Sequence, residues 1–153
     1  MTAIQEKSPD FVRYVLMIVI DPVTGFAVGL TKLKGPSYLL NRITFPGGKI
    51  DNDESVYCAA SREMMEEAGL AIAEDQWTIF DIVTCADYEL TKLVARSADV
   101  MTAYTRELEP VWHLAIERHL EYAARSPELY TQDFIANLHG ALAVLPLEIA
   151  LSS

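Results

Sequence analysis

Residues 47–70 read GGKIDNDESVYCAASREMMEEAGL, and this stretch predicts a turn-rich loop that leads into a single helix. Glycine, aspartate and asparagine crowd its first positions, and these residues favour turns. Asp53 is expected to cap the amino end of the helix, which places Glu54 at the positive end of the helix dipole. Gly69 is expected to end the helix, because glycine readily adopts a left-handed conformation.

Three glutamates gather near the carboxyl end of this helix. Glu63, Glu66 and Glu67 lie three and four positions apart, so their side chains share one side. Like charges at this spacing repel, and acids at a helix carboxyl end oppose the helix dipole. A hard divalent cation such as Mg²⁺ or Mn²⁺ would reverse that penalty, because it takes oxygen ligands. The residues alone leave two interpretations open, which are a metal site and an acidic solvated helix.

Arg62 is the only cation among these acids. Its planar guanidinium can pair with Glu66, four residues further on, and hold that carboxylate in one rotamer.

The full spacing is more specific than the three glutamates. Gly48, five residues, Glu54, seven residues and then REMMEEAGL resemble the signature of the Nudix hydrolases, Gx5Ex7REUxEExGU, in which U is apolar. Every fixed position matches. The resemblance implies a magnesium-dependent hydrolase, with Mn²⁺ as a substitute, and an α/β/α sandwich. It implies that the metal ligands are the Gly48 carbonyl, Glu63, Glu66 and Glu67, with Arg62 and Glu54 bracing the loop and the helix.

Strand-like segments flank the predicted helix on both sides. Residues 11–20 and 26–33 predict a hairpin, and residues 77–85 and 100–105 predict two further strands. Residues 86–99 are ambiguous between a hairpin connection and a longer substrate loop. Helices are expected over residues 113–124 and from Pro127 to Pro146. Together these segments predict one α/β domain over residues 1–153, a mixed sheet with helices on both faces.

Composition excludes several classes of protein. The 153 residues carry a formal net charge of −10 without a basic run, which argues against duplex nucleic acid as a partner. Residues 15–20 form the longest apolar run, too short to span a membrane, and residues 1–10 lack a signal-peptide core. We therefore expect a cytoplasmic protein without a membrane partner. The two cysteines predict neither a disulfide framework nor a zinc site. Homodimer formation stays an open expectation.

Four residues outside the glutamate cluster are candidates for substrate binding. Arg42 and Lys49 flank the loop and can contact phosphates, although they can equally be surface charges. Tyr88 lies 18 residues beyond Leu70, where some dinucleoside-polyphosphate hydrolases of the family carry a tyrosine. Trp112 is either a base-stacking residue or part of the core.

A further acid is expected near the metal cluster. Glu107 and Glu109 alternate, so in an extended chain both face the same way, and Pro110 favours extended geometry at Glu109. We predict that Glu109, or failing that Glu107, reaches the cluster as accessory ligand or general base. The alternative is two solvated loop acids, in which case Glu63 becomes the leading candidate for the base.

The reaction that the resemblance implies is hydrolysis of a pyrophosphate linkage. The substrate would be a small molecule, a nucleoside diphosphate linked to another group: a (d)NTP, ADP-ribose or another nucleotide sugar, or a dinucleoside polyphosphate. The alternative is a Nudix module that senses a nucleotide without cleaving it, although such modules usually carry a degraded signature.

Overall fold

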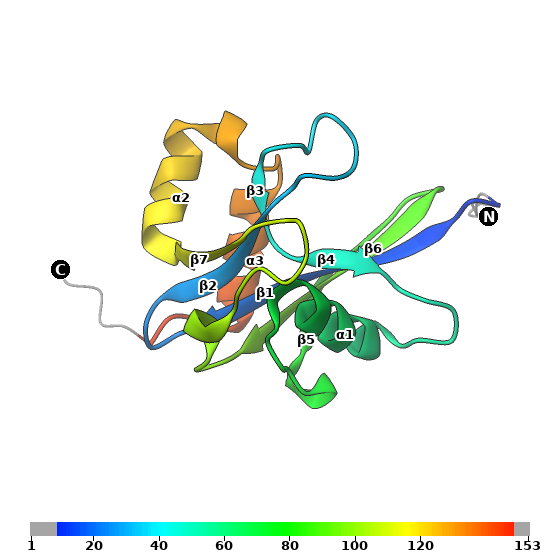
Figure 1. Ribbon diagram of the computed structural model, residues 1–153, viewed down its shortest axis with the longest axis horizontal. Helices are drawn as coiled ribbons and strands as arrows, with labels where there is room; N and C mark the ends of the chain where they lie inside the picture. The colour runs from blue at the N-terminus through cyan, green and yellow to red at the C-terminus, as the bar shows by residue number, and fades with distance from the viewer. Residues whose placement is uncertain (1–8, 149–153) are drawn as a thin grey trace, which may run out of the picture.

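A seven-stranded mixed sheet organises the protein (Figure 1). The computed structural model describes residues 9–148. The strand order is β3-β2-β1-β6-β5, while β4 pairs with β1 and β7 with β2. The strands are β1 (Val12–Asp21), β2 (Phe26–Thr31), β3 (Ile43–Thr44), β4 (Gly47–Lys49), β5 (Thr78–Thr84), β6 (Tyr88–Arg96) and β7 (Val111–Ala115). β1 and β6 run parallel, and the other pairs are antiparallel.

Helices cover both faces of the sheet. They are α1 (Val56–Ala68), α2 (Ile116–Arg125) and α3 (Phe134–Val144), with short 3-10 turns at Glu74–Gln76, Val100–Thr102 and Pro127–Leu129. Successive side chains of a strand point to opposite faces. Met17 and Val19 of β1 therefore pack with α1, whereas Ile18 and Ile20 pack with α2 and α3. This arrangement confirms the predicted mixed α/β/α sandwich, and Figure 1 shows α1 separated from the other two helices.

The β1–β2 hairpin is confirmed, but two segments between α1 and β7 differ from the prediction. Residues 86–99 are neither a connection nor a substrate loop, because β6 occupies their centre and lies between β1 and β5. Its charges masked the strand pattern, and the buried Lys92 is tolerated there because its ammonium lies 3.3 Å from the Asp81 carboxylate of β5. The strand predicted over residues 100–105 was wrong, since this stretch begins with the 3-10 turn at Val100–Thr102.

The two predicted carboxyl-terminal helices are shorter than expected. Residues 111–115 form β7 along β2, so the helix predicted over residues 113–124 begins at Ile116. The helix predicted from Pro127 is broken before α3, because the amide of Thr131 donates to the carbonyl of Ile43 at 3.0 Å. That contact ties the chain to β3. Among the described helices, none has the length and apolarity that crossing a membrane would need.

Candidate active site

Helix α1 is bounded by two capping residues. Ser55 rather than the predicted Asp53 caps its amino end, with Oγ accepting from the Cys58 amide at 3.0 Å. Asp53 lies in the preceding turn with a φ of 68°, a conformation that aspartate tolerates. Gly69 ends the helix as predicted, with a φ of 67° and its amide bonded to the Met65 carbonyl.

Arg62 lies at the centre of a charged network on this helix. Its Nε and Nη2 donate to the two carboxylate oxygens of Glu54 at 2.7 and 2.9 Å. Nη1 donates to Glu63 at 3.1 Å and to Glu66 at 3.2 Å, which confirms the predicted Arg62–Glu66 pair. Nη2 also reaches the Lys49 carbonyl at 3.0 Å. One planar group therefore joins the loop to the helix.

The same network sets the protonation of its members. The hydrogen bonds from Arg62 hold the pKa of Glu54 at about 2. Glu54 also accepts from the Asp51 amide at 3.0 Å, so this carboxylate braces the loop from the amino end of α1. Its place supports the structural role that was predicted for it.

Gly48 of β4 brings the backbone against a carboxylate of α1. A Cβ atom added at Gly48 would lie within 3.0 Å of the Glu63 carboxylate, closer than the non-bonded contacts that Cβ atoms make in proteins. Only glycine lets Glu63 approach the strand this closely.

Replacing Gly48 by Ala is therefore expected to displace the Glu63 carboxylate and lower activity. The cost in stability should be about 1 kcal/mol, at the low end for overpacking, because the clashing group is the flexible end of a side chain. Thermal unfolding and turnover measure the two effects. In a Glu63→Ala background the same change should cost almost no stability, because the clashing carboxylate is gone. An equal loss of stability in both backgrounds would contradict the contact.

Glu67 carries the strongest electrostatic signal in the site. Its Oε2 is buried without a hydrogen-bond partner among the described residues. Burial, followed by the charge of Glu63, raises the pKa of Glu67 to about 8, while nearby Lys32 opposes that rise. Burial also raises the pKa of Glu63. A half-buried, orphaned carboxylate beside another acid is costly unless a cation joins them.

The residues fit a hard divalent cation in part. Glu63 supplies oxygen atoms beside the Gly48 backbone, and Glu67, whose charge interacts with that of Glu63, adds a buried oxygen that has no hydrogen-bond partner in the described structure. Glu66 instead faces Arg62. Among residues 9–148, no group of three or more histidine, cysteine, aspartate or glutamate side chains lies close enough together to hold a metal ion. The ligand set predicted from the sequence is thus only partly assembled.

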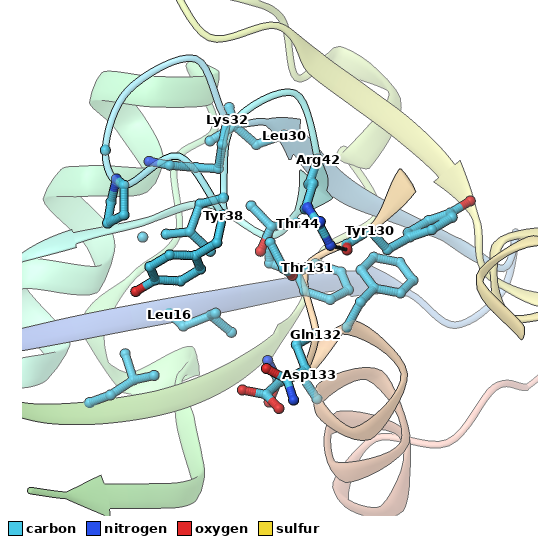
Figure 2. Close-up of a pocket in the computed structure, with 18 of the residues that line it drawn as sticks. Leu16, Leu30, Lys32, Tyr38, Arg42, Thr44, Tyr130, Thr131, Gln132 and Asp133 are labelled. Carbon is cyan, nitrogen blue, oxygen red and sulfur yellow. Dashed lines mark hydrogen bonds between the residues drawn. The ribbon is translucent and has the colours of Figure 1, made fainter. Parts of the chain in front are cut away.

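A cavity of about 1050 Å³ opens beside this carboxylate site and extends over the α3 face of the sheet (Figure 2). Gly48 belongs to its wall, so the cavity meets the carboxylate site at the glycine against which Glu63 packs. Figure 2 shows Lys32 and Tyr38 on one side and Gln132 and Asp133 on the other. Its aromatic lining consists of Tyr14, Tyr38, Phe45, Tyr88, Tyr130 and Phe134. A cavity lined by aromatic side chains suits a ligand with a flat, partly apolar group.

Two of the four predicted substrate residues lie on the cavity wall. Arg42 and Tyr88 line it, and Arg42 donates to the Tyr130 carbonyl at 3.2 Å. In the described structure, Lys49 and Trp112 lie outside the wall. Lys49 is exposed, and Trp112, 44% exposed, donates to Thr31 Oγ1 at 2.6 Å. Their substrate roles stay predictions.

The predicted general base Glu109 has unexpected partners. Its Oε2 accepts from the amides of Leu33 and Lys34 at 2.7 and 3.2 Å, and Lys32 Nζ lies 3.4 Å from each of its oxygens. Glu107 is exposed, and its charge contributes to the raised pKa values of Glu63 and Glu67. Both acids thus influence the carboxylate site, while the base prediction itself remains open.

Sequence reasoning missed Asn137. It is only 5% exposed, lines the cavity, and shows no side-chain hydrogen bond among the described residues. The sequence did contain a signal for this residue. An asparagine lies between Phe134 and Leu138 in the apolar stripe of the helix, and a polar side chain at such a position needs a hydrogen-bond partner.

The fold, the intact signature and the adjoining cavity define a hydrolase of the Nudix type. The NUDIX domain model matches residues 11–126, so the chain belongs to that family. With that membership and the complete signature, the protein is classed as a Nudix pyrophosphohydrolase. A comparison with curated proteins gave no match.

Solved structures share the fold at low sequence identity. One described as an ADP compounds hydrolase is 19% identical, with a TM-score of 0.67 over 91% of this chain and 74% of that one. A MutT NUDIX hydrolase from Burkholderia pseudomallei is 19% identical, with a TM-score of 0.64 over 85% and 97%. A bifunctional NMN adenylyltransferase/ADP ribose pyrophosphatase from Francisella tularensis, complexed with AMP and a Mn ion, is 13% identical, with a TM-score of 0.67 over 88% and 41%. This chain therefore spans less than half of that last protein.

Proposed function

We propose that the protein hydrolyses the pyrophosphate linkage of a nucleoside diphosphate joined to another group, and that it requires Mg²⁺ or Mn²⁺. The observation that carries this proposal is the buried Oε2 of Glu67, which has no partner in the described structure and whose charge interacts with that of Glu63. Glu63 in turn packs against Gly48, which belongs to the wall of the aromatic cavity. A cation would satisfy both acids and attract the polyphosphate to an otherwise acidic site.

Each part of the site has a proposed task. Glu63, Glu67 and the Gly48 carbonyl would hold the metal, with Glu66 joining them when it leaves Arg62. When bound, the metal would neutralise the pyrophosphate and lower the pKa of a water molecule. Arg62 fixes the direction of Glu63 through the 3.1 Å hydrogen bond. Glu63, packed against Gly48, is our candidate for proton acceptance, and Glu109 is the competing one.

The cavity would hold the nucleoside. Its aromatic side chains offer flat apolar surfaces, and the unpartnered amide of Asn137 offers both a donor and an acceptor. Candidate substrates remain (d)NTPs, ADP-ribose and other nucleotide sugars, and dinucleoside polyphosphates. The descriptions of the structural neighbours, which include ADP compounds and ADP ribose, favour testing the ADP derivatives first.

The test is a panel of these compounds incubated with Mg²⁺ or Mn²⁺, with and without an added phosphatase. For ADP-ribose and the dinucleoside polyphosphates, which have no terminal phosphate before cleavage, phosphate release that needs the phosphatase indicates that a phosphoanhydride bond has been cut. Chromatography of the products formed without the phosphatase shows which bond breaks, for the (d)NTPs as well. We expect turnover of at least one compound, and its loss in EDTA. Full turnover in EDTA would contradict the metal requirement. Binding of a panel compound without cleavage would favour the alternative, a nucleotide-sensing module.

A further inference from the structure

Residues 32–42, here called the rim loop, form one edge of the cavity. They connect β2 to β3, and Lys32, Lys34, Tyr38 and Arg42 all line the cavity. Tyr38 is nevertheless 69% exposed. Lys32 is paired through its backbone with Arg42 and Asn41, which closes the base of the loop. The next two amides, those of Leu33 and Lys34, belong to exposed residues and have no backbone acceptor in the described structure.

Glu109 provides the acceptor for these amides from a distant part of the chain. Its Oε2 binds both amides, from 76 and 75 residues away in sequence, and its charge faces the Lys32 ammonium. The Glu109 side chain is only 12% exposed. A shielded carboxylate that accepts two amides and faces an ammonium is fixed in position.

Glu109 belongs to a segment that is itself fixed to α1. Residues 103–110, here called the anchor loop, pass over the carboxyl end of that helix. The Tyr104 amide donates to the Ala68 carbonyl at 3.0 Å, and Arg106 Nη1 donates to the Met65 carbonyl at 3.0 Å. The first of these donors satisfies a carbonyl that the helix end leaves unpaired, and Arg106 adds a second donor to the Met65 carbonyl that the Gly69 amide already binds. The anchor loop thus connects the helix turn that carries Glu67 to the rim loop.

We propose that Glu109 is a positioning residue that holds the rim loop at a fixed place relative to the carboxylates of α1. This inference rests on the proposed function, since it assigns Glu109 to substrate placement rather than to proton transfer. Without the carboxylate, Leu33 and Lys34 lose their acceptor and Lys32 loses its counter-charge. Cavity residues on the loop would then take up their binding positions less often, which weakens binding more than chemistry.

The amide contacts make Glu109→Ala and Glu109→Gln an informative pair. A glutamine keeps one oxygen that can accept from both amides, but it loses the charge and replaces the oxygen that faces Lys32 by an NH2 donor, whereas alanine removes the acceptor altogether. Hydrogen exchange at the Leu33 and Lys34 amides measures the contact without any substrate. We expect fast exchange in Glu109→Ala and slow exchange in Glu109→Gln. Glu107→Gln, from the same loop, is the matched control and should leave these two amides protected.

Steady-state kinetics with the fastest compound of the panel then separates the roles. We expect Glu109→Ala to raise KM on the order of tenfold while kcat changes about threefold or less, and Glu109→Gln to stay near the wild-type KM. A loss of about 10²-fold or more in kcat in the Gln variant, with loss of one limb of the pH profile, would overturn the proposal and identify Glu109 as the base. That result decides the question even if the Ala variant does not fold.

Unchanged exchange at Leu33 and Lys34 in the Ala variant would also overturn the proposal. If the wild-type protein cleaves no compound of the panel, the proposed function fails, while the exchange experiment still decides whether Glu109 holds the rim loop.

Discussion

Replacing Glu67 by Gln is expected to lower kcat by about 10²-fold or more, because it removes a charged ligand while preserving shape. The same variant should unfold at a higher temperature than the wild type in metal-free buffer at neutral pH. The wild-type carboxylate is buried beside Glu63, and its Oε2 has no partner in the described structure. At neutral pH this buried carboxyl must either hold a proton that the unfolded chain has released or carry a buried charge, and a neutral amide has neither cost.

The pH dependence of this stability follows from the raised pKa. The pKa of Glu67 is about 8 in the folded protein, and 4.5 is the ordinary value for the unfolded chain. Between these values the folded state holds a proton that the unfolded state has released. Stability of the metal-free protein therefore falls as pH rises through this window, by on the order of a few kcal/mol at most. The Gln variant should lack this decline.

Thermal unfolding in EDTA from pH 5 to pH 9, beside turnover with Mg²⁺, measures both effects. Added Mg²⁺ should stabilise the wild type at pH 8 more than it stabilises the variant, because it binds the carboxylate. Glu121→Gln on α2 is a suitable control, because that exposed acid pairs only with Arg125 in the described structure. A Glu67→Gln variant with normal turnover would contradict the ligand assignment.

The local part of the site could be predicted from sequence because its contacts are short-range. Arg62 meets Glu66 one turn away, and Gly69 ends the same helix. The cap was predicted two residues early, since aspartate and serine both favour that position and only the turn decides between them. Here Asp53 takes the left-handed place in the turn.

The cavity and its rim could not be predicted in this way, because their contacts join distant segments. The Glu109 carboxylate meets amides about half the chain away, which no spacing rule anticipates. Strand β6 was missed for a related reason. The polar side chains of a central strand read as a loop until their partners, such as Asp81 for Lys92, are known. Tertiary pairing outweighs local propensity at such positions.

Replacing Arg62 by Lys should also be harmful, although the charge is kept. The guanidinium of Arg62 donates hydrogen bonds to the carboxylates of Glu54, Glu63 and Glu66 and to the Lys49 carbonyl. A single ammonium cannot span both oxygens of Glu54 and still reach Glu63. We expect kcat to fall about tenfold or more, because Glu63 loses its fixed direction, an effect equivalent to about 1.4 kcal/mol of barrier.

The acid stability of the protein provides a second measure of the same network. The folded-state pKa of Glu54 is about 2, lowered from 4.5 by Arg62. Its contribution to stability is therefore complete above the ordinary value and is lost as pH falls towards 2. Arg62→Lys should weaken this contribution, so the wild-type advantage in thermal unfolding should be larger at pH 6 than at pH 2.5.

Arg125→Lys on α2 is the matched control, because Arg125 also pairs with a glutamate four residues away but is exposed. Such surface pairs contribute about 0–1 kcal/mol, so neither kcat nor acid stability should change noticeably. If Arg62→Lys keeps more than half of the wild-type kcat, less than about 0.5 kcal/mol of barrier is at stake. The guanidinium would then brace the loop without orienting Glu63, and the loss of acid stability would remain as its only measurable effect.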